Sequence, residues 1–384
     1  MAAALVADGM TATDTHLDAR FDAQSGGQLF ESPTGIAPVL QVHPTRRCNL
    51  ACAHCYTLSA PTVSEQLDWD MLSACVQDAA LLGYRQLAVS GGEPLLYKRL
   101  PDLLKQARAL GMLTSITTNG MLATPQRWSQ ISDHLDVVAI SIDGTEAEHD
   151  LMRGQKGAFA KTLSHLAIIR ASGVPFGLIF TLTQHNVDSL EFVVQLAAQQ
   201  GARSVQVHPL TLYGRAAASL SDARPDGLEL LVAIAESKRI GQQLGVTVHV
   251  DALSLQQLSA YHRHLVPAYP LVNITDAAPI LIVQADGAVL PLTHDVDRQL
   301  WLGSLHKKNL SGLAQDWMQY GGADRLVQAC EQTWNELNQH DYADHAEPNT
   351  EIQHAAVYWY DEVAARTRTR SNDKLFMLHE IQLA

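Results

Sequence analysis

The chain has 384 residues, 47% hydrophobic and 17% charged, which is ordinary for a globular protein with one large core or two modest ones. Its formal net charge of −13 argues against a nucleic-acid-binding protein, because phosphate recognition needs a basic face. The sequence shows no bilayer-spanning apolar run, no secretory signal and too few cysteines for a disulfide framework, so we expect a reduced, cytoplasmic protein with no membrane partner.

The first two thirds of the chain alternate short apolar runs with amphipathic stretches. Residues 1–36, rich in small and polar residues, are predicted to form a flexible N-terminal arm. Buried strands are predicted at 39–42, 86–89, 113–116, 135–140, 175–181 and 204–208. Helices are predicted at 67–82, 100–110, 159–171 and 187–200. This alternation predicts a parallel sheet with right-handed crossovers, so residues 37–217 are expected to form a partial (β/α)6 TIM-like barrel, open rather than completed to eight units.

The pattern changes after residue 217. Residues 218–310 are predicted to contain a long helix at 228–244, a strand at 246–250 and a hairpin with an Asp286-Gly287 turn between apolar runs. Residues 311–384 are predicted to be mainly helical. The predicted fold class is therefore α/β: the partial barrel followed by a small α+β C-terminal extension.

Three cysteines, Cys48, Cys52 and Cys55, lie close together just after the first predicted strand, with the spacing C-x3-C-x2-C. Three thiolates suit one [4Fe–4S] cluster in which one iron has no protein ligand. An open coordination position is typical of a catalytic rather than a structural metal site. A zinc knuckle that adds His54 as the fourth ligand is the alternative.

Polar motifs follow the next three predicted strands, at the edge of the sheet where ligands bind in α/β folds. These motifs are Ser90-Gly-Gly-Glu-Pro94, Thr117-Thr-Asn-Gly120 and Ser141-Ile-Asp-Gly144. Gly91 and Gly92 would allow the backbone to approach a ligand, and Glu93 could accept a hydrogen bond from an amine. Downstream, Arg153 offers a planar fork that suits a carboxylate. The set predicts binding of an amino-acid nucleoside.

Over residues 38–216 the order of these motifs resembles that of radical S-adenosylmethionine (SAM) enzymes, in the branch that includes peptide maturases and anaerobic sulfatase-maturing enzymes. The resemblance implies that Cys48, Cys52 and Cys55 hold a [4Fe–4S] cluster whose fourth iron chelates the amino and carboxylate groups of SAM. It also implies SAM contacts from Tyr56 near the adenine, Gly91, Gly92 and Glu93 at the methionyl amine, Asn119, Ser141 and Asp143 at the ribose or methionyl portion, and Arg153 on the carboxylate.

The reaction implied by the resemblance is reductive cleavage of SAM, followed by hydrogen abstraction from a substrate by the 5′-deoxyadenosyl radical. A flavodoxin- or ferredoxin-type donor would supply the electron. The expected substrate is a ribosomally made peptide, which would be cross-linked, epimerised, excised or rearranged. Two alternatives are a radical SAM enzyme acting on a small metabolite or cofactor precursor, and a catalytically silent metal-binding scaffold that regulates a partner.

Residues 280–305 resemble the core of the SPASM or twitch extension, which holds auxiliary clusters in many such maturases. The cysteines are missing, because Leu292 follows Pro291 where the pattern has Cys, and Cys330 is the only later thiol. We therefore expect a degenerate extension without auxiliary clusters. Residues 293–295 and Asp297 are predicted to form an exposed loop, with a replacement metal site as the alternative.

Three further expectations concern side chains and partners outside these motifs. His43 and His208 are expected to be hydrogen-bonded core residues rather than catalytic ones, although both lie near strand ends. Residues 358–360 are expected to form an aromatic packing cluster. The sequence predicts no leader-recognition module, so a peptide would be presented by a separate recognition protein or would bind the acidic surface through a basic leader.

Overall fold

The structure, a computed structural model, describes residues 37–338 and 356–367, so the predicted arm at 1–36 lies outside the described residues. Ten strands in the described part form one sheet with the order β11-β10-β9-β1-β2-β3-β4-β5-β6-β7. These strands are β1 (Val39–Val42), β2 (Gln86–Val89), β3 (Leu113–Thr118), β4 (Val137–Ser141), β5 (Phe176–Leu182), β6 (Ser204–Pro209), β7 (Thr247–Val250), β9 (Ile280–Val283), β10 (Ala288–Pro291) and β11 (Gly303–Ser304).

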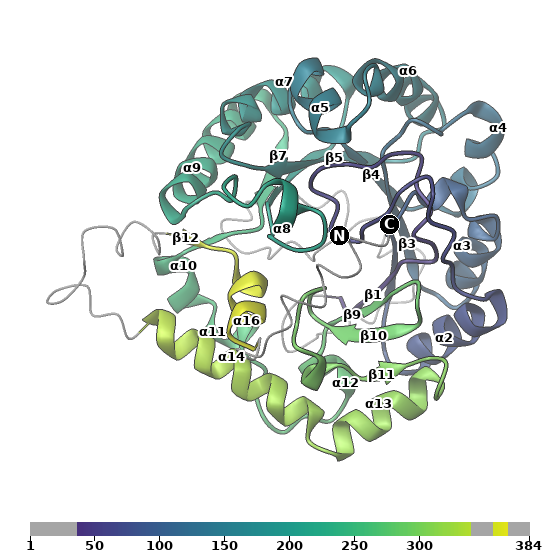
Figure 1. Cartoon of the computed structure of the whole chain (residues 1–384), viewed down its shortest axis with the longest axis vertical. Coiled ribbons are helices and arrows are strands. Elements are labelled where there is room, and N and C mark those ends of the chain that lie inside the picture. The colour runs from purple at the N-terminus through teal and green to yellow at the C-terminus, as the bar shows by residue number, and fades with distance from the viewer. Residues whose placement is uncertain (1–36, 339–355, 368–384) are drawn as a thin grey trace, which may run out of the picture.

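Helices cover the outside of the sheet, and Figure 1 shows the strands around the centre of the molecule. The helices of the barrel region are α2 (Trp69–Leu81), α3 (Leu100–Ala109), α4 (Pro125–Trp128), α5 (Glu146–Arg153), α6 (Ala158–Ala171), α7 (Leu190–Gln200), α8 (Ala216–Ser219) and α9 (Gly227–Leu244). Those of the C-terminal region are α10 (Leu255–Ala260), α11 (His262–Leu265), α12 (Ile274–Ala277), α13 (Leu310–Gln319), α14 (Gly322–Asn338) and α16 (Trp359–Thr367).

Local sequence accounts for where the helices begin. The Asp68 carboxylate accepts hydrogen bonds from the first backbone amides of α2, and Asp226 and Glu229 form a reciprocal capping box at the start of α9. On α2, Leu72, Cys75 and Val76 are buried at helical spacing. The predicted helices of the barrel are therefore present, each facing the sheet with its apolar side.

The predicted α/β fold with an open barrel is confirmed, but eight strands rather than six run parallel. Strand β7 pairs in parallel with β6, and β9 pairs in parallel with β1. The reason lies in the composition of β9, Ile280-Leu-Ile-Val283, whose four residues are all buried and therefore need a strand on each side. The predicted hairpin of β9 and β10 is present, and it continues the barrel sheet instead of forming a separate unit.

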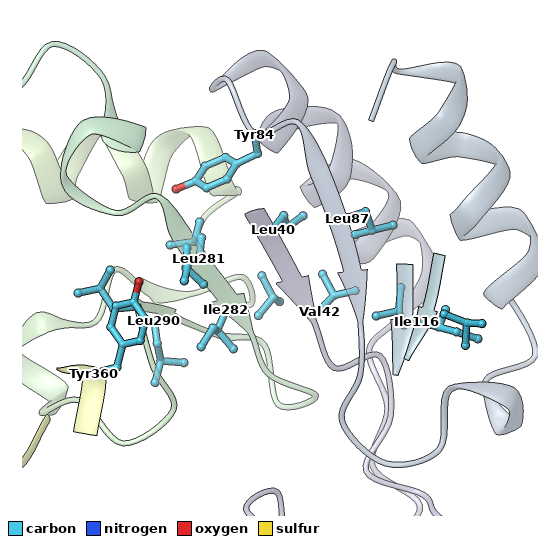
Figure 2. Packing of buried hydrophobic residues seen from close by; sticks show 14 of the residues in the cluster. Leu40, Val42, Tyr84, Leu87, Ile116, Leu281, Ile282, Leu290 and Tyr360 are labelled. Carbon is cyan, nitrogen blue, oxygen red and sulfur yellow. The ribbon is translucent and has the colours of Figure 1, made fainter. Parts of the chain in front are cut away.

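The core crosses the boundary between barrel and extension. Figure 2 shows Leu281 and Ile282 of β9 beside Leu40 and Val42 of β1. The Tyr84 hydroxyl, in the loop before β2, donates a hydrogen bond of 2.8 Å to the backbone oxygen of Ala278. These contacts make the extension part of the wall that surrounds the carboxyl ends of the strands.

A small second sheet lies where the barrel is open, between β7 and β9. Strands β8 (Leu253–Ser254) and β12 (Ala356–Val357) pair antiparallel, which leads the chain into residues 358–360. Among the described helices, none combines the length and the hydropathy that crossing a membrane requires.

Candidate functional site

A solvent-open cavity lies at the carboxyl ends of the parallel strands. Its wall includes the three clustered cysteines and most of the residues that the sequence motifs singled out. The lining residues among those predicted are Cys48, Cys52, Cys55, Tyr56, Gly91, Gly92, Glu93, Asn119, Ser141 and Arg153. Asp143 is the one predicted contact residue that is not on this wall.

Each clustered cysteine sulfur is approached by N–H groups. The backbone amide of Leu50 lies 3.4 Å from the Cys48 Sγ, and that of Ser59 lies 3.3 Å from the Cys55 Sγ. The Arg153 guanidinium lies 3.8 Å from the Cys52 Sγ. Hydrogen bonds to sulfur and a nearby cation favour thiolates, which are the form that binds iron–sulfur clusters.

Burial raises the pKa of Cys48 and Cys52 and so opposes their ionisation in the absence of metal. Desolvation, reinforced by the neighbouring Glu93 carboxylate, raises the pKa of Cys48 to about 12. A bound metal centre deprotonates such a thiol outright. The donors and the buried thiols together fit an iron–sulfur cluster that supplies the compensating charge.

The arrangement fits a cluster better than a zinc knuckle. His54, which a zinc site would need as its fourth ligand, places its Nε2 3.2 Å from the Asp143 Oδ2. In the described part of the chain, no three His, Cys, Asp or Glu side chains are grouped to hold a single ion. A [4Fe–4S] cluster does not require such convergence, because each thiolate binds a different iron.

The two glycines before Glu93 accommodate the cysteine loop itself. A Cβ on Gly92 would lie 2.3 Å from the Arg47 backbone oxygen, and one on Gly91 would lie 2.8 Å from the His43 Cβ. The Glu93 amide donates to the same Arg47 oxygen at 3.0 Å. On this side of the glycines, the space that the sequence predicted for a ligand is therefore filled by the protein's own backbone.

Glu93 joins the ends of β2 and β3. Its buried carboxylate accepts hydrogen bonds from the Thr118 hydroxyl at 2.7 Å and from the Asn119 amide at 3.0 Å. Burial raises the pKa of Glu93, while these hydrogen bonds act in the opposite direction. The Asn119 side chain in turn donates to the Asn49 side chain at 2.9 Å, so the second and third motifs are connected to the cysteine loop.

Asp143 lies behind Arg153. The Arg153 Nε is 2.7 Å from the Asp143 Oδ2, and both side chains are buried. Although burial alone would raise it, Arg153 and His54 hold the pKa of Asp143 well below its ordinary value. The Asp143 amide donates to the Nδ1 of His149, so the loop after β4 is fixed on both sides. This geometry makes Asp143 the residue that positions Arg153 beside Cys52.

An imidazole and phenol cluster packs above β1, with Tyr56 and His294 on the cavity wall and His43 buried behind them. The Tyr56 ring lies 4.4 Å from that of His294, which stacks at 4.8 Å on His43. The Gln41 amide contacts the Nε2 of His43 at 3.0 Å, and burial lowers the pKa of His43 to about 3. Both imidazoles are therefore neutral, since burial also lowers the pKa of His294.

The prediction of an exposed loop at residues 293–295 was wrong. These residues line the cavity, and Asp295 is buried. The pairing of β9 with β1 brings the end of β10 over the cavity, which the sequence pattern of the hairpin alone could not indicate.

The part of the cavity wall furthest along the sheet from β1 comes from β6 and the segment after β12, and Asp251, which follows β7, contacts it. The His208 Nδ1 lies 2.9 Å from the Asp251 Oδ2, and the Gln206 amide lies 2.9 Å from the same oxygen. The Tyr358 ring meets the His208 ring edge-on at 5.1 Å. His208 is hydrogen-bonded as predicted, but it also lines the cavity, as do Tyr358 and Tyr360. Sequence reasoning missed Asp251, although it directly follows a predicted strand.

A second missed residue, Arg215, holds the cysteine loop from the far end of the barrel. Its guanidinium donates to the backbone oxygens of Cys52 at 2.6 Å and Ser59 at 2.9 Å. The preceding Gly214 packs so closely that a Cβ would lie 2.5 Å from the Tyr56 backbone oxygen. The sequence signal was its place shortly after a predicted strand, at the end of the segment whose motifs resemble those of radical SAM enzymes.

Several known proteins are similar in sequence to this chain. Residues 42–197 match the family model of the radical SAM superfamily. The chain is 33% identical over 225 residues to the PqqA peptide cyclase of Ruegeria pomeroyi, covering 56% of this chain and 60% of the relative. It is 34% identical over 180 residues to the Fe-coproporphyrin III synthase of Methanosarcina barkeri, covering 46% and 45%. The chain thus spans about half the length of these curated relatives.

Solved structures show the same fold. SuiB of Streptococcus suis bound to S-adenosylmethionine has a TM-score of 0.60 at 15% identity, covering 75% of this chain and 68% of SuiB. The structure of anSMEcpe with bound AdoMet and the Cp18Cys peptide has a TM-score of 0.58 at 15% identity, covering 89% of this chain and 98% of anSMEcpe. The resemblance predicted from the motifs is confirmed.

Proposed function

Because residues 42–197 match the family model of the radical SAM superfamily, we propose that the protein is an enzyme that cleaves SAM reductively at a single [4Fe–4S] cluster and modifies a ribosomally made peptide. The observation that carries the proposal is the set of three thiols, each with an N–H group beside its sulfur, on the wall of one cavity with the Gly-Gly-Glu and Thr-Asn-Gly motifs. When bound, the cluster and SAM supply one-electron chemistry that removes a hydrogen atom from a substrate.

The protein's own residues would hold these groups and keep water out. Cys48, Cys52 and Cys55 would ligate the cluster, and the buried cation of Arg153 would stabilise the thiolate of Cys52. SAM would lie along the wall between the cysteine loop and the ends of β2 to β4, in contact with Tyr56, Gly91, Gly92, Glu93, Asn119, Ser141 and Arg153. In this proposal Asp143 acts on SAM only through Arg153.

A peptide substrate is supported by several of the similar proteins. The curated relatives include PqqA peptide cyclases, and one SuiB structure holds its precursor peptide SuiA. The cavity is open to solvent and wide enough to admit a side chain from a peptide held outside. A separate recognition protein would present the peptide, and a flavodoxin- or ferredoxin-type protein would donate the electron.

A small tetrapyrrole is the second candidate substrate. The observation that favours it is the 34% identity to an Fe-coproporphyrin III synthase and to a pre-heme d1 synthase, each over 180 residues. Those matches cover less of this chain than the PqqA peptide cyclase matches, so the peptide is preferred.

Anaerobic reconstitution with iron and sulfide tests the cofactor. We expect about four iron atoms per chain and, after dithionite and SAM are added, release of 5′-deoxyadenosine. The triple variant C48A/C52A/C55A should hold no cluster, whereas C75A, which removes another buried thiol, should hold a full one. A zinc-only protein, or iron retained by the triple variant, would contradict the proposal.

The substrate is tested separately by mass spectrometry. Synthetic peptides matching the short reading frames beside the gene are incubated with the reduced enzyme and SAM, and Fe-coproporphyrin III precursors form the second arm. A modified peptide supports the preferred reading, and a modified tetrapyrrole overturns it in favour of the second candidate.

A further inference from the structure

His208, on the cavity wall, forms a hydrogen-bonded pair with Asp251. The proposed cofactor site uses neither residue. His208 lies on β6, and Asp251 directly follows β7, so both sit at the carboxyl ends of adjacent strands. The Asp251 carboxylate accepts the His208 Nδ1 at 2.9 Å and the Gln206 amide at 3.1 and 2.9 Å. The Asp251 backbone amide also donates to the Val207 oxygen at 2.9 Å, which fixes the carboxylate relative to β6.

This network determines which nitrogen of His208 carries the proton. Asp251 is an acceptor, so the Nδ1 of His208 is the donor in a neutral imidazole. The Nε2 then has a free lone pair. The His208 side chain is 32% exposed, while the Asp251 side chain is 7% exposed, so the imidazole is the member of the pair that faces the cavity.

His43 provides the contrast within the same cavity region. Its side chain is buried, its Nε2 contacts Gln41, and it does not line the cavity. This pattern is typical of a histidine with a structural role in the core. His208 instead presents its orientated imidazole to an open space, next to the Tyr358 ring.

We propose that His208, orientated by Asp251, is the proton acceptor for the substrate on the wall formed by β6 and the segment after β12. The inference rests on the proposed function and deepens it by assigning the side of the cavity where the substrate reacts. The substrate group is one with a removable hydrogen on oxygen or nitrogen next to the reacting carbon, such as a phenol, a hydroxyl or an amide of a peptide residue.

The step is a proton transfer without a change of oxidation state. The substrate O–H or N–H bond breaks, its electron pair stays on the substrate atom, and a new N–H bond forms at the His208 Nε2. The Asp251 carboxylate balances the charge of the resulting imidazolium, as it does in other Asp–His pairs. General base catalysis of this kind contributes roughly 10²- to 10⁴-fold.

The first test measures coupling. The variants H208Q and D251N are compared with the wild-type enzyme and with H185Q, which changes an exposed histidine outside the cavity. We expect the ratio of modified peptide to released 5′-deoxyadenosine to fall by about 10²-fold in H208Q and to stay at the wild-type value in H185Q. An unchanged ratio in H208Q overturns the inference, and so does loss of iron together with the ratio, which indicates a structural role.

The pH profile adds a readout that a structural role would not move. The acidic limb of the coupling ratio, along which the base is lost by protonation, should move to lower pH in D251N, because the imidazolium loses its carboxylate partner. The groups facing His208 that could contribute are Asp251, Tyr358, His294 and Asp295, so H294Q is measured in parallel. A profile that changes in H294Q but not in D251N contradicts the assignment to His208.

A second test needs no substrate. Long-range ¹H–¹⁵N spectra of histidine-labelled protein before cluster loading report the tautomer, with H208Q used to assign the signal. We expect His208 to carry its proton on Nδ1 in the wild type and to lose this preference in D251N. An Nε2–H tautomer in the wild type overturns the inference. Failure of the proposed function itself would instead appear as absent 5′-deoxyadenosine in the wild type.

Discussion

Asp143 and Gly92 each have a structural role at the site that the motifs did not indicate. Asp143 holds the guanidinium that approaches the Cys52 sulfur, and Gly92 leaves room for the Arg47 carbonyl. Both residues were identified from the sequence as ligand contacts, because a motif reveals which residue types recur at strand ends. It does not reveal whether the space beside them is taken by a ligand or by the chain.

Replacing Asp143 by Asn should destabilise the protein by about 3–5 kcal/mol, because the Arg153 cation would remain buried without its partner. The low pKa of Asp143 means that its contribution to the free energy of unfolding is present above pH about 4 and is lost as the pH falls further. Urea unfolding of the cluster-free protein between pH 7 and pH 3 checks both statements. A D143N variant with wild-type acid sensitivity would contradict them.

Gly92→Ala should displace the cysteine loop, because the new Cβ would lie 2.3 Å from the Arg47 oxygen. We expect a loss of about 1–3 kcal/mol in stability and a large fall in iron bound after reconstitution. Gly173→Ala is the control, since its Cβ meets nothing within 4 Å although its φ of +76° makes the substitution strained. It should lower stability without lowering iron content, and equal iron losses in both variants would reject the steric explanation.

The segment after β6 stabilises the cysteine loop that follows β1, on the other side of the barrel. Arg215 follows β6 and reaches two carbonyl oxygens of the loop that follows β1. Sequence periodicity predicted β6, its neighbours and the helices between them, because these depend on residues close together in the chain. It could not predict the Arg215 contacts, which join residues more than 150 positions apart.

Arg215→Met keeps much of the apolar stem and removes the two charge-assisted hydrogen bonds, which should cost about 1.5–3 kcal/mol each in the stability of the loop. The consequence should be faster loss of iron to a chelator at unchanged secondary structure. Arg203→Met, at an exposed arginine before β6, is the matched control. The explanation fails if the two variants lose iron at the same rate.

At the scale of the whole molecule, barrel and extension share one sheet. Strand β9 supplies the second neighbour of β1 and buries all four of its residues against the core. The motifs and the six central strands could be predicted from the sequence, and so could the hairpin of β9 and β10. The parallel pairing of β9 with β1 could not, because a fully buried apolar run indicates two neighbours but does not identify them.

A truncated chain of residues 37–217, the predicted barrel core, should therefore fail to fold as a soluble monomer. It would expose the edge of β1 and the apolar surface that Leu281 and Ile282 cover. In the full chain, denaturant unfolding followed by circular dichroism and by tryptophan fluorescence should give one coincident transition. A cooperatively folded 37–217 fragment would show that the extension is a separate unit.

The pairing of β1 with β9 also has a consequence for synthesis on the ribosome. Val283 lies 228 positions after Cys55. At roughly 5–20 residues per second, the three thiols would therefore be synthesised about 10–50 s before strand β9, which forms part of the cavity wall. During that interval the nascent chain presents its sulfurs to oxygen and to stray metal ions. Iron should thus be delivered after translation, or a protein factor should protect the newly synthesised cysteine loop.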